Sequence, residues 1–235
     1  MKIAIIGYGK MGKAIEQIAK QRNHEIAIII DKNDDVNSLK NQKVDVAIEF
    51  STPETAYQNI ITCLNSNIPI VIGTTGWLDK YAEVENLCKE KNSSFIFASN
   101  YSIGANIYFE INRKLAKIMN NQSNFEVSID ETHHIHKLDA PSGTAISIAN
   151  DIIQEIDRKN NWTMENANEN SIHINAYREG EVFGNHTVNY ESENDIIEIT
   201  HKAKSRNGLA FGAVVAAEYI HNKKGIFTMK DILNF

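Results

Sequence analysis

The sequence predicts an α/β protein, with a Rossmann-type dinucleotide-binding domain and a second α+β domain built on a mixed, mostly antiparallel sheet. Apolar strand-like segments alternate with amphipathic helical segments over the first hundred residues, and a glycine-rich turn follows the first strand. After residue 104, apolar and polar residues alternate singly instead. The domains expected are 1–104 for the dinucleotide, 105–206 for substrate binding and oligomerisation, and a C-terminal segment 207–235 that returns to the first domain.

The first domain contains five short apolar segments that predict strands, at 3–6, 25–30, 45–50, 69–72 and 94–98. The segment after the first strand has apolar residues at helical spacing, and Pro53 is placed to open a later helix at its first turn. A further helix is expected at 78–91. Strands this apolar are buried on both faces, so we expect a parallel sheet with helices on both sides.

The second domain is expected to begin with a helix at 105–119. Phe125, Val127 and Ile129 then alternate with polar residues, which predicts a strand with one polar or subunit-facing side. The remaining segments are a helix at 143–156, a polar loop at 160–170, strands at 172–177, 182–190 and 196–202, and a small-residue helix at 208–220. The last helix has few charges and suits packing on the first sheet.

Composition excludes several classes of function. The 24 basic and 30 acidic residues give a net charge of −6 with no long basic run, so nucleic acid is not expected as a partner. The longest uncharged apolar stretch, 209–217, is far too short to span a bilayer. Cys63 and Cys88 lie in separate predicted helices, and two free thiols are typical of a cytoplasmic protein. No signal peptide is expected, because a strand begins almost at once.

A nucleotide-binding fingerprint joins the first strand to the first helix. Gly7 permits the tight turn, Gly9 lets a pyrophosphate approach the backbone, and Gly12 lets helix and strand pack closely. The N–H groups of the helix start suit phosphates. The whole expected contact set is Gly7, Tyr8, Gly9, Lys10, Met11 and Gly12.

Asp31 lies nineteen residues beyond Gly12, at the end of the second strand, where a carboxylate can accept hydrogen bonds from ribose hydroxyls. Lys32 follows directly and could pair with a 2′-phosphate, which Asp31 would disfavour. We therefore expect NADH and/or NADPH as cofactor, without a ranking. Ligands bind at the carboxyl ends of parallel strands, so two further loops are expected to contact the cofactor. They contribute Gly73, Thr74 and Thr75, and Ser99, Asn100 and Tyr101.

The most chemically informative segment runs from Glu131 to Thr144 and holds three histidines and a lysine. His133 and His134 are adjacent, so on a strand they point in opposite directions. No Cys or H-E-x-x-H helix accompanies them, so no metal is expected. Ser142 can cap a helix that begins near Gly143, whose exposed N–H groups would hold an anion. The loop therefore suits binding and protonation of a small carboxylate.

The segment resembles the signature of the 4-hydroxy-tetrahydrodipicolinate reductase family, formerly called dihydrodipicolinate reductase. Further blocks resemble that family in the family's order, so the resemblance covers essentially the whole chain. They are Gly73-Thr74-Thr75-Gly76, Ser99-Asn100-Tyr101-Ser102-Ile103-Gly104, Arg178-Glu179-Gly180-Glu181-Val182 with Gly184, His186 and Thr187, and Thr200-His201-Lys202-Ala203 with Ser205 and Arg206. The glycine fingerprint is one residue shorter than in many members.

The resemblance implies a reductase of lysine and diaminopimelate biosynthesis. Such an enzyme reduces the cyclic imine derived from 4-hydroxy-tetrahydrodipicolinate to tetrahydrodipicolinate, with a hydride from NADH or NADPH. By position, His133 is the general acid/base and Lys137 the proton donor. His134, Gly143 and Thr144 hold the carboxylates of the dicarboxylate substrate. A homotetramer joined through the second domain's sheet is also implied.

Two alternatives stay open at this point. Another Rossmann-type oxidoreductase, acting on amino or sugar substrates, would share the first domain. The sugar-oxidising relatives typically carry a Glu-Lys-Pro triad, whereas this chain has Phe50-Ser51-Thr52-Pro53 after its third strand. A non-catalytic NAD(P)H-binding regulator would not need His133, His134 and Lys137 beside an anion-binding helix start.

Overall fold

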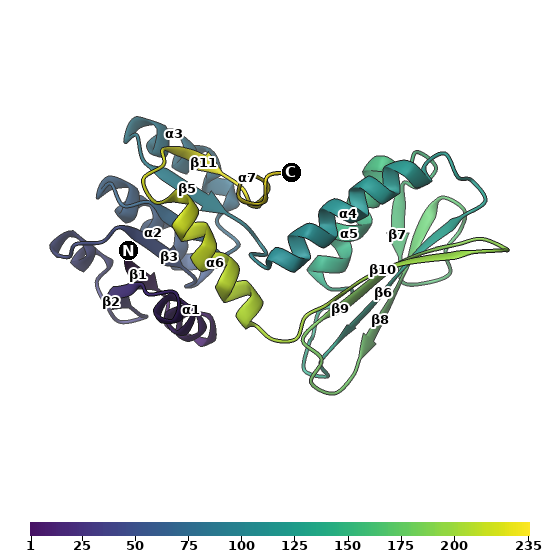
Figure 1. Cartoon of the computed structure of the whole chain (residues 1–235), viewed down its shortest axis with the longest axis horizontal. Coiled ribbons are helices and arrows are strands. Elements are labelled where there is room, and N and C mark those ends of the chain that lie inside the picture. Colours follow the sequence, from purple (N-terminus) through teal and green to yellow (C-terminus); the bar gives the residue numbers. More distant parts are fainter. The chain divides into compact units, whose positions relative to one another are not determined.

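The computed structural model describes residues 1–235 and divides them into two compact units. The first unit comprises Met1–Ile103 and Arg206–Phe235, and the second comprises Gly104–Ser205. Figure 1 labels the elements of each. Each unit has its own sheet and its own hydrophobic core, so each is described separately.

The first unit is built on a six-stranded parallel sheet with the order β11-β5-β4-β3-β1-β2. The predicted parallel sheet is thus confirmed. The five expected strands occur within one or two residues of their predicted bounds. The strands are β1 (Lys2–Ile6), β2 (Glu25–Ile30), β3 (Val46–Glu49), β4 (Ile70–Ile72), β5 (Ser94–Phe97) and β11 (Gly225–Phe227).

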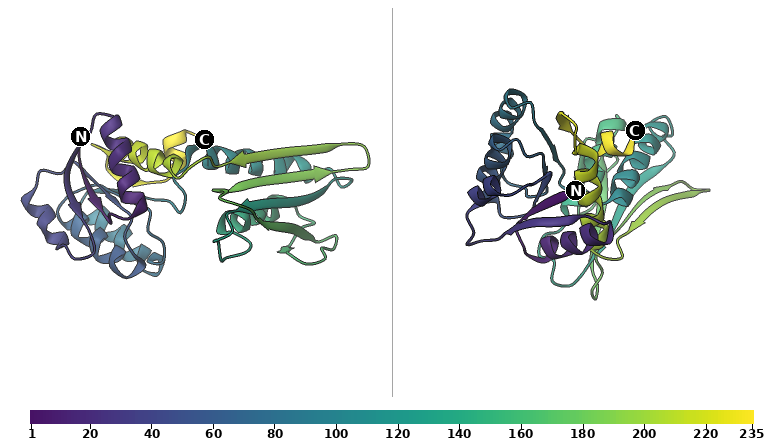
Figure 2. Two further views of the ribbon diagram at one scale, coloured as in Figure 1. Left: turned by 90° about the horizontal axis from the view of Figure 1, so that it is seen from below. Right: turned by 60° about the vertical axis from the view of Figure 1, so that its left-hand side comes forward.

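Helices cover both faces of this sheet, and successive strand residues enter two different cores. Ile3 and Ile5 pack with α1 and α6 on one face, while Ala4 and Ile6 pack with α2 and α3 on the other. Figure 2 shows the two helix layers with the sheet between them. The helices are α1 (Lys10–Gln21), α2 (Pro53–Asn65), α3 (Tyr81–Glu90), α6 (Asn207–Ile220) and α7 (Met229–Leu233), with 3-10 turns at Val36–Asn41 and Leu78–Lys80.

Close packing brings α6 against the strand ends of the first sheet. A side chain at Gly212 would place its Cβ 1.7 Å from the carbonyl oxygen of Tyr101, so only glycine fits there. Glu218 of α6 accepts hydrogen bonds from Arg22 at the end of α1, at 2.7 and 2.8 Å. Strand β11 and helix α7, which follow α6, were not predicted, because three and five residues are too short to show a periodicity.

The second unit has a five-stranded mixed sheet with the order β10-β9-β6-β8-β7. The predicted mixed, mostly antiparallel sheet is confirmed, because the two antiparallel pairings join seven residue pairs each, whereas the two parallel pairings join six and three. Helices α4 and α5 pack on one face of the sheet (Figure 1). The elements are α4 (Ile103–Met119), β6 (Glu126–His133), α5 (Gly143–Glu155), β7 (Asn161–Thr163), β8 (Ser171–Arg178), β9 (Asn185–Glu191) and β10 (Ile196–Lys202).

Two local predictions for this unit are wrong. The polar stretch 160–170 contains β7, which pairs with the start of β8 and was expected to be a loop. Main-chain pairing of this kind depends on the neighbouring strand and leaves no signature in a polar sequence. Strand β9 begins at Asn185 and not at 182, because the preceding residues form a turn in which Gly180 has a φ of +45°.

The three central strands of the second sheet carry hydrogen-bonded polar side chains between them. Asp130 on β6 accepts hydrogen bonds from Asn175 on β8 at 2.8 Å and from Asn189 on β9 at 2.7 Å. A carboxylate thus links the three central strands. Elsewhere in the chain, none of the helices combines the length and the apolar character that crossing a membrane requires.

Candidate active site

The glycine-rich turn has the geometry that its spacing predicts. Gly7 has a φ of +87°, and a Cβ there would lie 2.1 Å from the carbonyl oxygen of Phe50. A Cβ on Gly12 would lie 2.2 Å from the carbonyl oxygen of Gly7. Gly9, by contrast, has no atom within 4 Å of its Cβ position, and it caps α1 without a side-chain hydrogen bond. The first N–H groups of α1 therefore lie beside open space, which fits a pyrophosphate.

Asp31 lies next to this turn. Its carboxylate accepts a hydrogen bond from the backbone N–H of Tyr8 at 3.2 Å, and its own N–H donates to Asp34 at 2.8 Å. The Tyr8 hydroxyl donates to Glu16 of α1. Lys10 and Lys32 are exposed at the same edge of the sheet. These residues leave the Asp31 side chain exposed while fixing it beside the place where a dinucleotide backbone would run.

The two other predicted cofactor loops follow β4 and β5, but some of their side chains serve the protein itself. The Thr74 hydroxyl donates to Oε1 of Glu49 at 3.0 Å. The buried Tyr101 hydroxyl donates to the carbonyl oxygens that close β4 and β5, those of Ile72 and Ile96. Thr75 and Ser99 are exposed at the strand ends, as a ligand contact would require. Gly73 and Asn100 are half-buried beside them.

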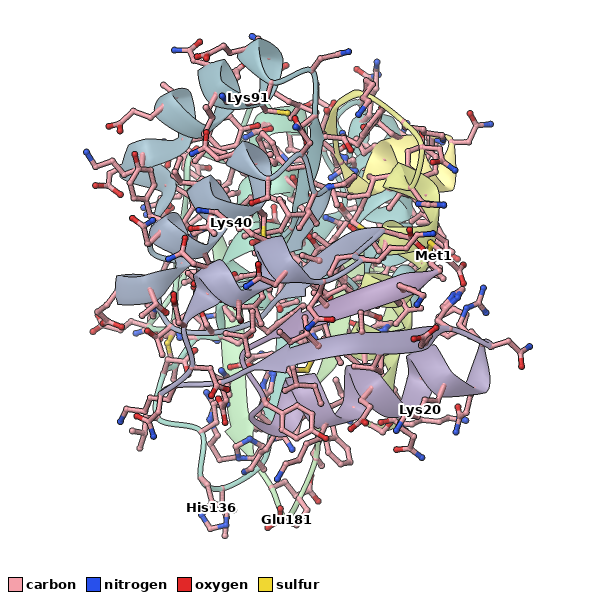
Figure 3. The ribbon with its side chains drawn as sticks, turned by 90° about the vertical axis from the view of Figure 1, so that its left-hand side faces the viewer. Met1, Lys20, Lys40, Lys91, His136 and Glu181 are labelled. Atoms are coloured by element: carbon pink, nitrogen blue, oxygen red, sulfur yellow. The ribbon has the colours of Figure 1, made fainter.

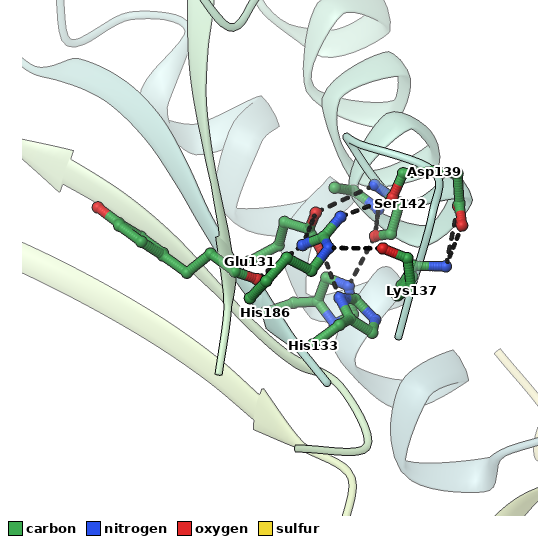
Figure 4. Close-up of polar contacts among 9 residues, drawn as sticks. Glu131, His133, Lys137, Asp139, Ser142 and His186 are labelled. Carbon is green, nitrogen blue, oxygen red and sulfur yellow. Dashed lines mark hydrogen bonds and ion pairs between the residues drawn. The ribbon is translucent and has the colours of Figure 1, made fainter. Parts of the chain in front are cut away.

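The end of β6 places two ionisable side chains on the buried face of the second sheet. Val127 and Ile129 fill the core under α4 and α5, and Glu131 and His133 continue the same face by the two-residue period of a strand. The Nδ1 atom of His133 contacts Oε2 of Glu131, and neither buried atom makes a hydrogen bond to another group. Figure 4 shows the two side chains turned toward each other.

The second oxygen of Glu131 has two further partners. Oε1 accepts from Nη1 of Arg178 at 3.1 Å and from the backbone N–H of Ser142 at 3.2 Å. Burial alone would raise the pKa of this carboxyl, but His133 and Arg178 together outweigh burial and lower the pKa to about 2. Glu131 is therefore a buried, ionised carboxylate at neutral pH.

Arg178 connects this carboxylate to the loop that carries Lys137. Its guanidinium donates to the carbonyl oxygens of Lys137 at 3.3 Å and of Asp139 at 2.6 Å. The ammonium of Lys137 in turn lies 2.8 Å from each carboxylate oxygen of Asp139 (Figure 4). One guanidinium thereby ties two carbonyl groups of the loop to the sheet. The predicted proton donor is held by a carboxylate that is itself largely exposed.

The start of α5 joins the same cluster. The Ser142 hydroxyl accepts from the N–H of Ala145 at 3.1 Å, so Ser142 caps the helix as predicted. The hydroxyl also lies 3.1 Å from Nε2 of His186 on β9. Burial, followed by the charge of His133, lowers the pKa of His186 to about 3, so His186 is neutral. No atom lies within 4 Å of the Cβ position of Gly143, which leaves its backbone open to a ligand.

The three histidines of the motif do not converge. His133 is buried and packs edge-on against His186, with ring centroids 5.1 Å apart. His134 is half-buried, and its ring lies 6.1 Å from that of His136. His136 is exposed at a loop tip, 3.5 Å from Glu181 on the neighbouring loop (Figure 3). The half-buried Thr144 follows Gly143 in the first turn of α5, where N–H groups have no intrahelical partner.

Glu131, His133 and His186 are also residue types that bind metals, and their potential ligand atoms lie within 4.8 Å of one another. The guanidinium of Arg178 already supplies positive charge to Glu131, and it would repel a divalent cation. The arrangement therefore favours an ion-paired cluster. The absence of a metal stays a prediction.

Comparison with known proteins identifies the family. Residues 1–101 match the model of the N-terminus of dihydrodipicolinate reductase, and residues 104–233 match the model of its C-terminus. The chain belongs to the dihydrodipicolinate reductase family. It is 51% identical to the 4-hydroxy-tetrahydrodipicolinate reductase of Christiangramia forsetii, over 100% of this chain and 98% of that protein. Identity to the reductase of Thermosipho africanus is 35%, over 99% of this chain and 98% of that protein.

A solved structure has the same fold. The dipicolinate-bound dihydrodipicolinate reductase from Paenisporosarcina sp. TG-14 superposes with a TM-score of 0.80, at 23% identity and over 97% of each chain. This match confirms the predicted fold. The family models and the relatives confirm membership of the reductase family, and the chain is an oxidoreductase that uses NADH or NADPH.

Sequence reasoning did not assign a role to three members of the buried cluster, Glu131, Arg178 and His186. A signal for Glu131 was present, since it lies two residues before His133 and shares its strand face. Arg178 and His186 lie in a block that resembles the family, but their spacing in the sequence does not show that they meet Glu131. Their proximity to His133 depends on the pairing of β6 with β8 and β9, which no local pattern reveals.

Proposed function

We infer that this chain catalyses the NAD(P)H-dependent reduction of the cyclic imine derived from 4-hydroxy-tetrahydrodipicolinate. The product is tetrahydrodipicolinate, an intermediate of lysine and diaminopimelate biosynthesis. The observation that carries this inference is the 51% identity to a named reductase over the whole chain. The buried His133 cluster and the Lys137 loop supply proton-transfer groups and cations that suit this reaction.

The first unit is the proposed cofactor domain. The open space at Gly9, the uncapped start of α1 and the exposed Asp31 carboxylate fit a dinucleotide. When bound, the reduced nicotinamide supplies the hydride. The proposed contacts are those expected from the sequence. Gly7 and Gly12 shape the glycine-rich turn, and Tyr101 fixes the loop after β5 through its buried hydroxyl.

The second unit is the proposed substrate domain. His133 acts as the general acid/base and Lys137 as the proton donor, because reduction of a conjugated imine leaves electron density that must be protonated. His134, Gly143 and Thr144 bind the two carboxylates, since the first turn of α5 offers N–H groups and a positive dipole end. A carboxylate substrate competes with Asp139 for Lys137, so substrate binding would release that ammonium from its internal partner.

The test is oxidation of NADH and NADPH at 340 nm, coupled to a synthase that produces the cyclic substrate from pyruvate and aspartate semialdehyde. We expect oxidation that depends on the synthase, with either cofactor. A folded protein that binds NADH and oxidises neither cofactor would contradict the proposed reaction. Dipicolinate, the ligand of the Paenisporosarcina protein, serves as a probe of the site and should inhibit.

We further propose a homotetramer assembled through the second sheet. Its edge strand β10 exposes Ile196 and Ile197, and Tyr177 on β8 is also exposed, so apolar surface is available for contact. Light scattering during size exclusion should give about four times the chain mass of 26.5 kDa. A mass of one chain at micromolar concentration would contradict the proposal.

The cytoplasm is the proposed location. Cys63 and Cys88 are both buried free thiols, and proteins with unpaired cysteines are typical of reducing compartments. Cell fractionation with the tagged protein would test this, and recovery in a secreted or membrane fraction would contradict it.

A further inference from the structure

We propose that Glu131 is a positioning residue that fixes the reactive tautomer of His133 and, through Arg178, the loop that carries Lys137. This inference rests on the proposed function, in which His133 is the general acid/base. A carboxylate on the same strand face, two residues away, contacts one ring nitrogen of the histidine and leaves the other to react.

The contact with Glu131 decides which nitrogen of His133 carries the proton. An ionised carboxylate can only accept a hydrogen bond, so contact with Oε2 of Glu131 keeps the proton on Nδ1. The Nε2 atom is then the one that exchanges a proton with a substrate. Gly184 is the residue that leaves room beside this atom, because a Cβ there would lie 3.0 Å from Nε2. Its φ of +150° is also one that a side chain would strain.

Two further groups of the site share the same carboxylate. Oε1 of Glu131 holds both the Ser142 N–H at the start of α5 and the guanidinium of Arg178. Arg178 then holds the carbonyls of Lys137 and Asp139. One buried carboxylate thus orients the acid/base, the proposed carboxylate-binding helix start and the proton-donor loop.

Stabilisation of the fold alone does not account well for the charge in this cluster. A buried ion pair is an expensive way to stabilise a fold, and apolar side chains of similar size often stabilise as well or better. His186 completes the packing around His133 without a charge, since its pKa is lowered to about 3 by burial and by His133. The charge of Glu131 is therefore better explained by what it orients.

The experiment is a double-mutant cycle on the full-length enzyme. Glu131→Gln, His133→Ala and the double variant are compared by kcat, KM and NADH affinity, with melting temperature as a control for folding. We expect Glu131→Gln to lower kcat by at least ~10²-fold, since loss of the correct tautomer costs that much or more in triad enzymes. In the His133→Ala background, the same substitution should lower kcat by a smaller factor, because the part that acts through His133 is then absent and only the part that acts through Arg178 on the Lys137 loop remains.

The outcomes separate the two proposals. If His133→Ala leaves kcat unchanged, the assignment of His133 as acid/base fails. Suppose that His133→Ala lowers kcat severely. If Glu131→Gln then lowers kcat only slightly, or by the same factor in both backgrounds, only the positioning role is overturned. Glu131→Asp covers the case in which the Gln variant does not fold. The shorter side chain keeps the buried charge but withdraws it from His133. Its effect on kcat should likewise be smaller in the His133→Ala background. Loss of wild-type activity on dialysis against a chelator would assign the cluster to a metal ion and overturn the proposal.

Discussion

At the scale of single residues, the site is defined by which charged atoms have partners. Glu131 is ionised because its contacts with His133 and Arg178 outweigh its burial, and His186 is neutral because burial dominates. Lys137 has an internal partner in Asp139, so it keeps its position before any substrate arrives. Each of these states follows from the immediate neighbours, and each can be changed by one substitution.

Lys137→Ala is expected to lower kcat by at least ~10²-fold, a typical contribution of a proton-transfer group. NADH affinity should be nearly unchanged, because the proposed cofactor contacts lie in the first unit. Steady-state kinetics and fluorescence titration measure the two effects. Lys117→Ala, which removes an exposed lysine of α4 in the same unit, is the control and should be neutral. Wild-type turnover in the Lys137 variant would remove this residue from catalysis.

Asp31→Ala is expected to weaken NADH binding about tenfold, the equivalent of one hydrogen bond to a charged group. NADPH should lose less, because its 2′-phosphate gains from removal of a nearby negative charge. Titration of both cofactors against the wild type and the variant checks this. Equal losses for the two cofactors would show that Asp31 does not contact the ribose.

At the scale of elements, the position of α6 depends on the absence of one side chain. Gly212 allows the helix backbone to approach the carbonyl of Tyr101, and Tyr101 holds the ends of β4 and β5 through its hydroxyl. These strand ends begin the loops that are proposed to contact the cofactor. A displacement of α6 would therefore shift the proposed cofactor loops and also disturb the packing of the core.

Gly212→Ala is expected to destabilise the protein by about 1–3 kcal/mol, the usual range for overpacking a core. Gly208→Ala in the same helix is the matched control. Its Cβ would meet only the Ser102 hydroxyl at 3.7 Å, an ordinary contact, so better helix propensity should leave stability unchanged or raise it slightly. Denaturant unfolding of both variants measures the difference. Equal stability of the two variants would show that α6 is not packed as described.

At the scale of the whole molecule, the proposed functions are divided between two units with separate cores. The glycine-rich turn and Asp31 belong to the first unit, and the His133 cluster belongs to the second. The titrating groups with the largest consequence for acid stability, Glu131 and His186, are both in the second unit. Acid should therefore first destabilise the unit that carries the proposed catalytic groups.

The pH dependence of stability follows from the direction of these shifts. Stability rises with pH wherever the unfolded chain binds more protons. His186 titrates near 6.5 when unfolded and near 3 when folded, so its contribution is lost as pH falls from 6.5 to 3. The Glu131 contribution to stability is present above pH 4.5 and is lost as pH falls toward 2. Since a shift of one pKa unit corresponds to about 1.36 kcal/mol, this contribution amounts to roughly 3 kcal/mol.

Denaturant unfolding of the second unit, followed between pH 7 and pH 2.5, measures this dependence. The wild type should lose stability steadily over that range. His186→Asn should flatten the curve between pH 6.5 and 4.5, whereas Glu131→Gln should flatten it only below pH 4.5. Parallel curves for the three proteins would show that neither group has the shifted pKa described above.

The local sequence pattern was sufficient to predict the longer strands and helices and the short motifs. The apolar period of each strand, the glycines of the turn, Pro53 at the first position of α2 and Ser142 at the cap of α5 all act through neighbours in sequence. Strand β7, strand β11 and the parallel pairings of β8 with β6 and β7 were not predictable in this way. Their hydrogen bonds go to distant segments, and a short strand carries no pattern of its own.

The sequence by itself determined the two-domain α/β plan, the nucleotide-binding turn, and the grouping of His133, Lys137 and the start of α5 within a dozen residues. Only the tertiary structure decided which atoms meet there. Pairing of β6 with β8 and β9 brings Arg178 and His186 to Glu131 and His133, and burial then sets the ionisation of the group. The physical reason is that charge state depends on solvent exclusion and on partners more than forty residues away, and neither is encoded in local spacing.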